Sequence, residues 1–361
     1  MESNPANLRP PYFLLCLCLV FFTLMTTGSI LSPDSEIVYR VGESIANSGT
    51  FSLDHELEGW PGFGTARGID GKIYSVFGPL ESIILAPCIK IAGFIDQTGW
   101  YNAVPALIPL SYHIDAGLQR RFYHQPATRL EPHAVRFLVS FLNVIVSLLC
   151  VYVFWRIVMN LVRDRTIAVI SSIVYAFGTM MWNYSGSLFS EPLATLFVLA
   201  SLDAAVSIDT QQVPEPGYGK SALLSGLYLG LAVAAHLSAI LFIPFFAGYV
   251  IWTVYRRKGN ISAGLRAAIF WTVGCGLILL LLGYYNVIRF GNWFETGRGV
   301  NPNAVRQFGY GEFVAPWQGL WGLLVSPSKG IFIYSPALVL GLIGWRKLHR
   351  SWKSLSWMLL L

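Results

Sequence analysis

The chain has 361 residues, of which 54% are hydrophobic and 12% are charged, with a net charge of +6. A soluble domain typically has about 25% charged residues. This composition excludes a soluble enzyme, a disordered protein and a disulfide-stapled secreted module, and it indicates a polytopic membrane protein that needs no nucleic-acid partner. In such a protein, the loops in which Lys and Arg lie are more informative about orientation than the net charge is.

The first apolar run, residues 12–31, is long enough to cross a bilayer as a helix. A cleaved signal peptide is the alternative for this run. The following segment, 32–133, holds 11 of the 19 acidic residues. Within it the apolar stretch 79–95 is interrupted by Glu81 and Pro87, which favours an interfacial helix over a crossing.

After this loop the apolar runs resume. They predict spans near 134–158, 167–182, 190–208, 221–236, 238–255, 265–288 and 331–346. The final residues form an apolar run that simply stops, which predicts a partial ninth span of a longer protein. The predicted fold class is therefore an all-α polytopic membrane protein with about eight complete transmembrane helices plus a partial ninth, and a large first outer loop containing interfacial helices.

This pattern divides the chain into five segments. They are the N-terminus with the first span (1–31), the outer loop (32–133), the helix bundle (134–288), a second outer loop with a re-entrant segment (289–330), and the last complete span with a basic turn and the truncated span (331–361).

Basic residues gather in short loops, with clusters at 156–165, 256–266 and 346–353. All of them fall on one face if 32–133 stays wholly on the other. The positive-inside rule then makes that face cytoplasmic. We expect a multi-pass protein of the cell membrane, with the N-terminus inside and the site on the outer face.

The segment after the first span, SPDSEIVYRVGESIANSG, predicts a short amphipathic helix that ends near Gly49. One face of it carries Glu36, Tyr39, Arg40 and Glu43. Asp34 stands at its start, where it is either a helix N-cap or a general base at the membrane surface, with Glu36 as the alternate base.

Further along the outer loop, Asp70 and Gly71 predict a turn that is flanked by Arg67 and Lys72. The two cations are either phosphate ligands or solvated loop charges.

Two ionisable residues belong to apolar segments. Glu191 opens a predicted span, where it either meets the helix dipole or supports a site. His236 lies between two half-length apolar segments. It is either a functional group or a neutral, hydrogen-bonded histidine.

The stretch WQGLWGLLVSPSKGIFIYSP interrupts an apolar run with two Ser-Pro pairs, and Lys329 lies inside the interruption. Irregular backbone at membrane depth must be buried in protein or line a cavity. We expect Lys329 to bind an anion; snorkelling to water or pairing with a carboxylate is the alternative. His and Cys are too few for a metal cage, and no metal or cofactor is expected.

The order of these segments resembles the GT-C glycosyltransferases, in particular the branch of protein O-mannosyltransferases and lipid A aminoarabinose transferases. The resemblance covers about residues 12–350. It is carried by PDSEIVYRVGESIANSG, DGKIYSVFGPLESIILAPCIKIAG, VRFLVSFLNVIVSLLCVYVFWRI, FGTMMWNYSGSLFSEPLATLFVLASL and SPSKGIFIYSP.

The resemblance implies a GT-C-like bundle in which Asp34 is the catalytic base and Glu191 matches an acid that opens the fourth span. Some relatives have a lysine in the loop that matches YSVFGPL, where this chain has Val76 and Phe77. Lys329, Lys72, Arg67 or His236 would then contact the donor phosphate, with Tyr39 and Asp70 as support. The segment 96–130 has no counterpart and reads as an insertion.

The implied reaction moves a sugar from a polyprenyl-phosphate donor to a glycan, lipid or protein acceptor on the outer face, with inversion and without metal. The lipid bilayer would be the donor's source. A transporter or flippase without covalent chemistry is the alternative, because broken helices suit it. An interaction subunit of a cell-envelope complex is a third hypothesis.

Overall fold

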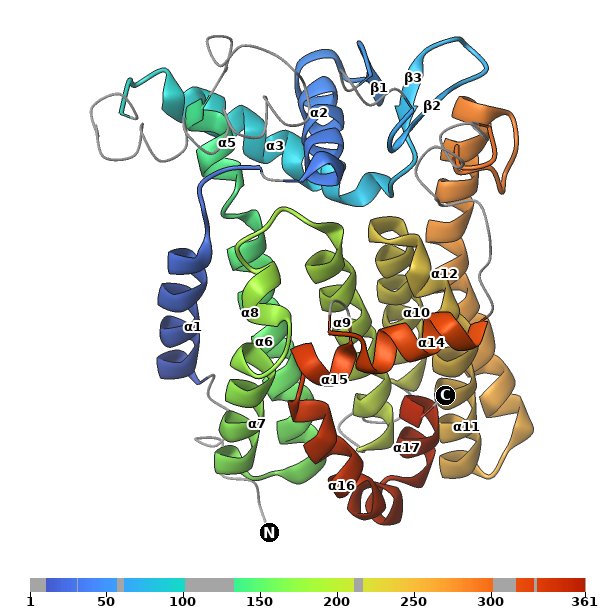
Figure 1. Ribbon diagram of the computed structural model, residues 1–361. Helices are drawn as coiled ribbons and strands as arrows, with labels where there is room; N and C mark the ends of the chain where they lie inside the picture. The colour runs from blue at the N-terminus through green and yellow to red at the C-terminus, as the bar shows by residue number, and fades with distance from the viewer. Residues whose placement is uncertain are drawn as a thin grey trace.

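The computed structural model describes residues 11–30, 32–56, 62–100, 133–210, 217–300, 316–327 and 330–360. These residues are mainly helical and form a bundle with a smaller layer across one end (Figure 1).

The bundle contains α1 (Tyr12–Met25), α6 (Leu142–Val162), α7 (Arg165–Phe177), α8 (Met181–Tyr184), α9 (Ser190–Asp209), α10 (Tyr218–Ala235), the 3₁₀ helix η4 (Leu237–Phe242), α11 (Ile243–Lys258), α12 (Ile261–Phe290), α14 (Pro316–Val325), α15 (Ile331–Tyr334), α16 (Ala337–Ser351) and α17 (Lys353–Leu360). The layer contains α2 (Pro33–Ser48), α3 (Pro79–Asp96), α5 (His133–Val139) and the strands β1 (Ser52–Leu53), β2 (Thr65–Arg67) and β3 (Ile73–Ser75).

Four helical segments in the described residues are long and apolar enough to cross a membrane: Ala134–Val162, Ser190–Asp209, Leu237–Lys258 and Ile261–Phe290. This establishes the coarse prediction of a predominantly helical chain with membrane-spanning character. The complete set of eight spans and a ninth stays a prediction.

Several predicted spans are shorter or interrupted in the structure. The run 12–31 gives only α1, which ends at Met25 ahead of Gly28 in the left-handed region (φ 73°). The run 167–182 is divided between α7 and α8, because α7 ends at Phe177 with Gly178 as its C-cap. The run 331–346 breaks at Ser335, since the following Pro336 cannot donate a backbone hydrogen bond. Hydropathy alone does not register these backbone signals.

The core of the bundle depends on close contact between α10 and α12. A Cβ atom added at Gly226 would lie 2.0 Å from the carbonyl oxygen of Trp271, and one at Gly274 would lie 2.2 Å from that of Leu223. Only glycine permits this approach, as in the small-residue interfaces of membrane helices. Around it pack buried side chains of α9, α11 and α17, including Leu355.

In the layer, α2 begins and ends as its sequence predicts. The hydroxyl of Ser32 accepts a hydrogen bond from the amide of Asp34 (3.3 Å), and Gly49 ends the helix in the left-handed region (φ 67°). Ser32 is therefore the N-cap, and the N-cap interpretation of Asp34 is wrong, because the helix already begins at Pro33.

The layer also contains a small antiparallel sheet with the order β1-β3-β2, which the sequence analysis did not predict. The strands have two or three residues each, too few for an alternating pattern to be recognised. The predicted turn at Asp70-Gly71 joins β2 to β3.

The stretch 79–95 forms one helix, α3, which lies across the end of the bundle in Figure 1. It packs on α2, where the hydroxyl of Ser82 donates to the carbonyl of Val38 (2.9 Å). At its start, a Cβ atom added to Gly78 would lie 2.3 Å from the carbonyl oxygen of Ala234 and 2.6 Å from that of Ala235. The layer thus meets the end of α10 backbone to backbone.

The basic clusters lie at the opposite end of the bundle, at the turns between α6 and α7, α11 and α12, and α16 and α17 (Figure 1). Arg257 donates to the carbonyl of Ile208, Arg156 pairs with Asp203 (2.9 Å), and Arg256 donates to the hydroxyl of Ser354 (3.1 Å). All three basic clusters thus lie at one end of the bundle, as the predicted orientation requires.

Candidate functional site

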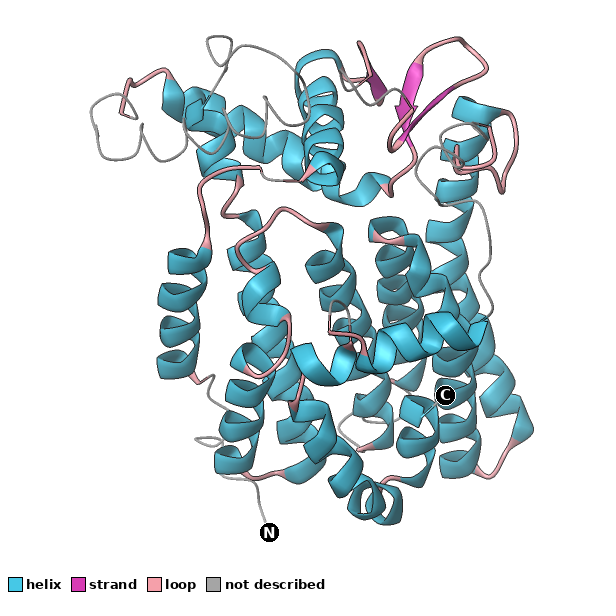
Figure 2. Ribbon diagram, viewed as in Figure 1, coloured by secondary structure: helices cyan, strands magenta, loops and turns pink. Residues whose placement is uncertain are grey.

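A cavity of about 630 Å³ lies where the layer meets the bundle. Its walls come from the start of α2, the loop before β2, the link from β3 to α3, the start of α9, the end of α10 and the loop after α12. Loops and turns gather at this junction (Figure 2). The size is within the range of small-molecule sites, about 300–1,000 Å³.

Asp34 lines this cavity from the first turn of α2 and is partly buried. Burial and the nearby carboxylate of Glu191 raise its pKa, while Arg298 lowers it. No group in the described residues donates a hydrogen bond to its carboxylate, so both oxygens are available to a ligand.

Glu191 lines the same cavity from the first turn of α9. Its position is set by Asn143 of α6, whose amide donates to the carbonyls of Ser187 (2.6 Å) and Phe189 (2.8 Å) just before that helix. The structure therefore brings together the two acids that the sequence analysis placed at separate segments.

His236 also lines the cavity. Its backbone is extended (φ −145°, ψ 118°) where α10 ends and η4 begins, and its Nδ1 lies 2.7 Å from the hydroxyl of Ser238. The predicted break between two apolar half-segments is present, and it faces the cavity.

Arg298 is a cavity residue that sequence reasoning missed. It lies in the loop after α12, between Gly297 and Gly299. The sequence signal for this residue is the pair of glycines that flanks it, and this signal alone does not place the side chain at the cavity.

The remaining predicted cations lie elsewhere. Arg67, Asp70 and Lys72 share the exposed β2–β3 hairpin, and none of them lines the cavity. The carboxylate of Asp70 accepts from the hydroxyl of Tyr74 (2.8 Å) and the amide of Lys72 (3.1 Å). Lys329 lies outside the described residues, so its role stays a prediction.

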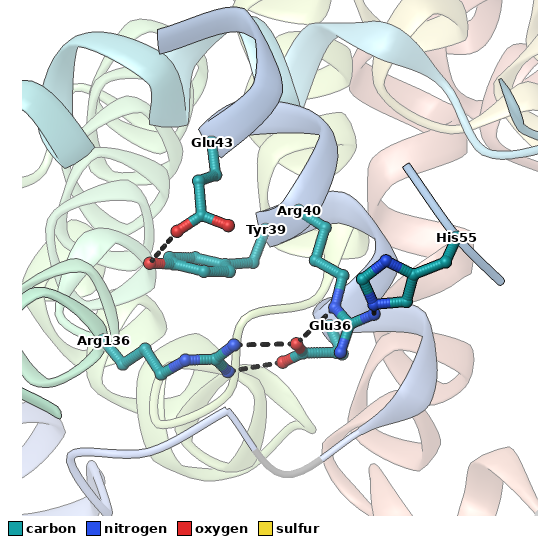
Figure 3. Close-up of polar contacts among 6 residues, drawn as sticks. All are labelled: Glu36, Tyr39, Arg40, Glu43, His55 and Arg136. Carbon is teal, nitrogen blue, oxygen red and sulfur yellow. Dashed lines mark hydrogen bonds and ion pairs between the residues drawn. The ribbon is translucent and has the colours of Figure 1, made fainter. Parts of the chain in front are cut away.

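Glu36 does not line the cavity and belongs to an ionic network that joins α2 to α5 (Figure 3). Arg136 donates to both of its carboxylate oxygens (2.5 and 2.8 Å), and Arg40 donates to one (2.8 Å). The guanidinium of Arg136 lies over the ring of Tyr39 (4.5 Å), whose hydroxyl donates to Glu43 (3.3 Å).

Burial alone would raise the pKa of Glu36, but Arg136 and then Arg40 lower it to about 2. The side chain is only 1% exposed and does not line the cavity. A carboxylate with both oxygens engaged is a poor proton acceptor, so the geometry favours Asp34 over Glu36 as a base. Tyr39 supports this network rather than the cavity.

Glu81 is a further acid, in the first turn of α3, and it does not line the cavity. It is fully buried, and neither carboxylate oxygen has a hydrogen-bond partner in the described structure. Burial and the charge of Glu191 raise its pKa to about 8, so it is mostly protonated at neutral pH.

Comparison of the chain with protein-family models, with curated proteins and with solved structures found no match. Among the described residues, no group of three or more His, Cys, Asp or Glu side chains is placed to hold a metal ion.

Proposed function

We propose that this protein is a membrane glycosyltransferase that moves a sugar from a polyprenyl-phosphate donor to an acceptor on the outer face, with inversion and without metal. The observation that carries the proposal is the cavity at the end of the apolar bundle, in which the available carboxylate of Asp34 and the guanidinium of Arg298 occur together. The first suits a proton acceptor, and the second suits a phosphate.

In the proposed reaction, the carboxylate of Asp34 takes the proton of an acceptor hydroxyl while the hydroxyl oxygen attacks the anomeric carbon. The bond from that carbon to the phosphate oxygen breaks, and its electron pair leaves with the lipid phosphate. Arg298 stabilises the charge that develops on this leaving group. A raised pKa of Asp34 favours this role, because it brings the base nearer to the working pH.

The other predicted residues take supporting roles. Glu191 and His236 line the cavity and would bind hydroxyl groups of the sugar or acceptor. The donor's lipid would lie along the apolar helices below. Lys329 remains a proposed phosphate ligand, whereas Arg67 and Lys72 lie on the exposed hairpin and fit this role less well.

Purified protein in lipid nanodiscs, given a polyprenyl-phosphate sugar and candidate acceptors, should release lipid phosphate. We expect Asp34→Asn to lower the turnover number by about 10²- to 10⁴-fold, which is the usual contribution of a general base. Asp54→Asn is the matched control, because Asp54 is exposed and lies away from the cavity. Full turnover in a folded Asp34→Asn variant would contradict the assignment.

The donor side is tested by Arg298→Gln, which we expect to raise the donor KM by about tenfold or more, equivalent to the loss of about 1.4 kcal/mol. Arg67→Gln on the hairpin is the matched control and should leave the donor KM unchanged. The reverse result would move the phosphate contact to the hairpin.

A lipid flippase is the second candidate, favoured by the break between α10 and η4 at the cavity wall. Proteoliposomes with a fluorescent polyprenyl-phosphate sugar distinguish the two. Movement of intact donor across the bilayer, without release of lipid phosphate, would support the flippase.

A further inference from the structure

The loop after α12 is folded around the side chain of Glu295. Its Oε1 accepts hydrogen bonds from the amides of Gly297 (2.7 Å) and Gly299 (3.0 Å), the two residues that flank Arg298. One carboxylate oxygen therefore fixes the backbone on both sides of the cavity arginine.

The conformation requires glycine at 297, and the carboxylate of Glu295 lies close against position 299. Gly297 has φ 94°, and a Cβ atom there would lie 2.7 Å from the ring of Phe290. A Cβ atom at Gly299 would lie 2.5 Å from Oε2 of Glu295. The sequence ETGRG at 295–299 thus encodes a tight loop with a single projecting cation.

The base of the loop is anchored by the last turn of α12. Arg289 is 3% exposed; it donates to the carbonyl of Ser75 (2.6 Å) and to Oδ1 of Asn286 (2.8 Å), and it stacks on Tyr285 (3.6 Å). The amide of Asn286 in turn donates to the carbonyl of Trp293 (3.1 Å). These contacts therefore hold the start of the loop and connect it to β3.

We propose that Glu295 is a positioning residue that presents Arg298 to the phosphate of the lipid donor. The proposal rests on the proposed function and names the residue that prepares its phosphate site. Glu295 makes no ion pair with Arg298 within the described chain, so its carboxylate organises the backbone and leaves the guanidinium to a ligand. Preorganised cations bind an anion without the entropic cost of ordering a loop.

The test uses farnesyl phosphate, a short prenyl phosphate, with the full chain in detergent. We expect Glu295→Ala and Arg298→Gln each to weaken its binding by about tenfold, which corresponds to about 1.4 kcal/mol. Glu295→Gln should stay within about threefold of wild type, because the amide oxygen still accepts from both backbone amides. Hydrogen exchange at Gly297 and Gly299 should become faster only in the alanine variant.

Two results would overturn the proposal: wild-type affinity in a Glu295→Ala protein whose loop amides exchange faster, or a Glu295→Gln protein as weak as the alanine variant. In transfer assays, Glu295→Ala should raise the donor KM, while kcat at saturating donor changes less. Binding that depends on Glu295 in a protein without transfer would refute the proposed function alone. Transfer with an unchanged donor KM in Glu295→Ala would refute the positioning role alone.

Discussion

Asp34 and Glu36 are two positions apart in α2, and their surroundings are opposite. Asp34 faces the cavity without a hydrogen-bond donor in the described residues, whereas Glu36 is enclosed by two guanidinium groups. Their pKa values move in opposite directions as a result, up for Asp34 because of burial and down for Glu36 because Arg136 and Arg40 outweigh burial. Their surroundings therefore leave the carboxylate of Asp34 open to a ligand and engage that of Glu36 in structural contacts, as the proposed function requires.

Glu81 should make the protein less stable as the pH rises. Its pKa is raised from 4.5 to about 8 by burial, so the folded state keeps a proton that the unfolded state has already lost between these values. Because of this group, the free energy of unfolding should be constant below this range and fall as the pH rises through it. The total fall is roughly 3–5 kcal/mol at most, since each pKa unit is worth about 1.4 kcal/mol.

Glu81→Gln keeps the shape of the neutral acid and cannot ionise. We expect thermal melting of this variant to depend less on pH between 5 and 8 and to exceed wild type at the alkaline end. Asp54→Asn, which changes an exposed acid, is the comparison variant. Parallel pH profiles for wild type and Glu81→Gln would show that Glu81 does not titrate in this range.

At the scale of the helix, the contact between α10 and α12 gives a second stability prediction. Gly226→Ala would place a Cβ atom 2.0 Å from the carbonyl oxygen of Trp271, so the two backbones must separate. Overpacking of this kind costs about 1–3 kcal/mol. A loss of this size should appear as a lower melting temperature in detergent.

Gly276→Ala is the matched control for that substitution. Gly276 is also in α12, and a Cβ atom there would have no neighbour within 4 Å. Alanine favours the helix over glycine by about 1 kcal/mol, so this variant should be as stable as wild type or more stable. Equal losses in both variants would mean that α10 and α12 do not depend on the close approach.

Helix-level features could be predicted where the signal is local. The face that joins Glu36 to Arg40 and Tyr39 to Glu43 follows from i, i+4 spacing, and Gly49 ends α2 as expected. The break at His236 was visible as two short apolar runs. The length of α1 and the division of 331–346 were not, because these depend on single backbone positions inside apolar sequence.

The cavity is a property of the whole molecule, and the sequence could not assemble it. Asp34, Glu191 and His236 were each identified as candidates, yet they are far apart in the chain and meet only through packing. Arg298 was missed because its exposure to the cavity depends on Glu295 and Arg289, which order the loop by contacts that no spacing rule encodes.

The two ends of the molecule also test the predicted orientation. In a chain without its native cysteines, Lys72→Cys lies on the exposed hairpin of the layer, and Arg165→Cys lies at the basic end. We expect an impermeant maleimide to label position 72 in intact cells and position 165 only after permeabilisation. The opposite pattern would invert the topology and place the cavity in the cytoplasm.

The contact of Gly78 with the last carbonyls of α10 has a mechanical consequence. Direct backbone contact leaves no side chain whose rotation could absorb a shift, so α3 and the end of α10 cannot move closer together at this point. Since Gly78 and His236 both line the cavity, we expect this part of the wall to keep its shape when a ligand binds. The loop with Arg298 is held in turn by the two hydrogen bonds that Glu295 accepts, so both parts of the wall are set before a ligand binds.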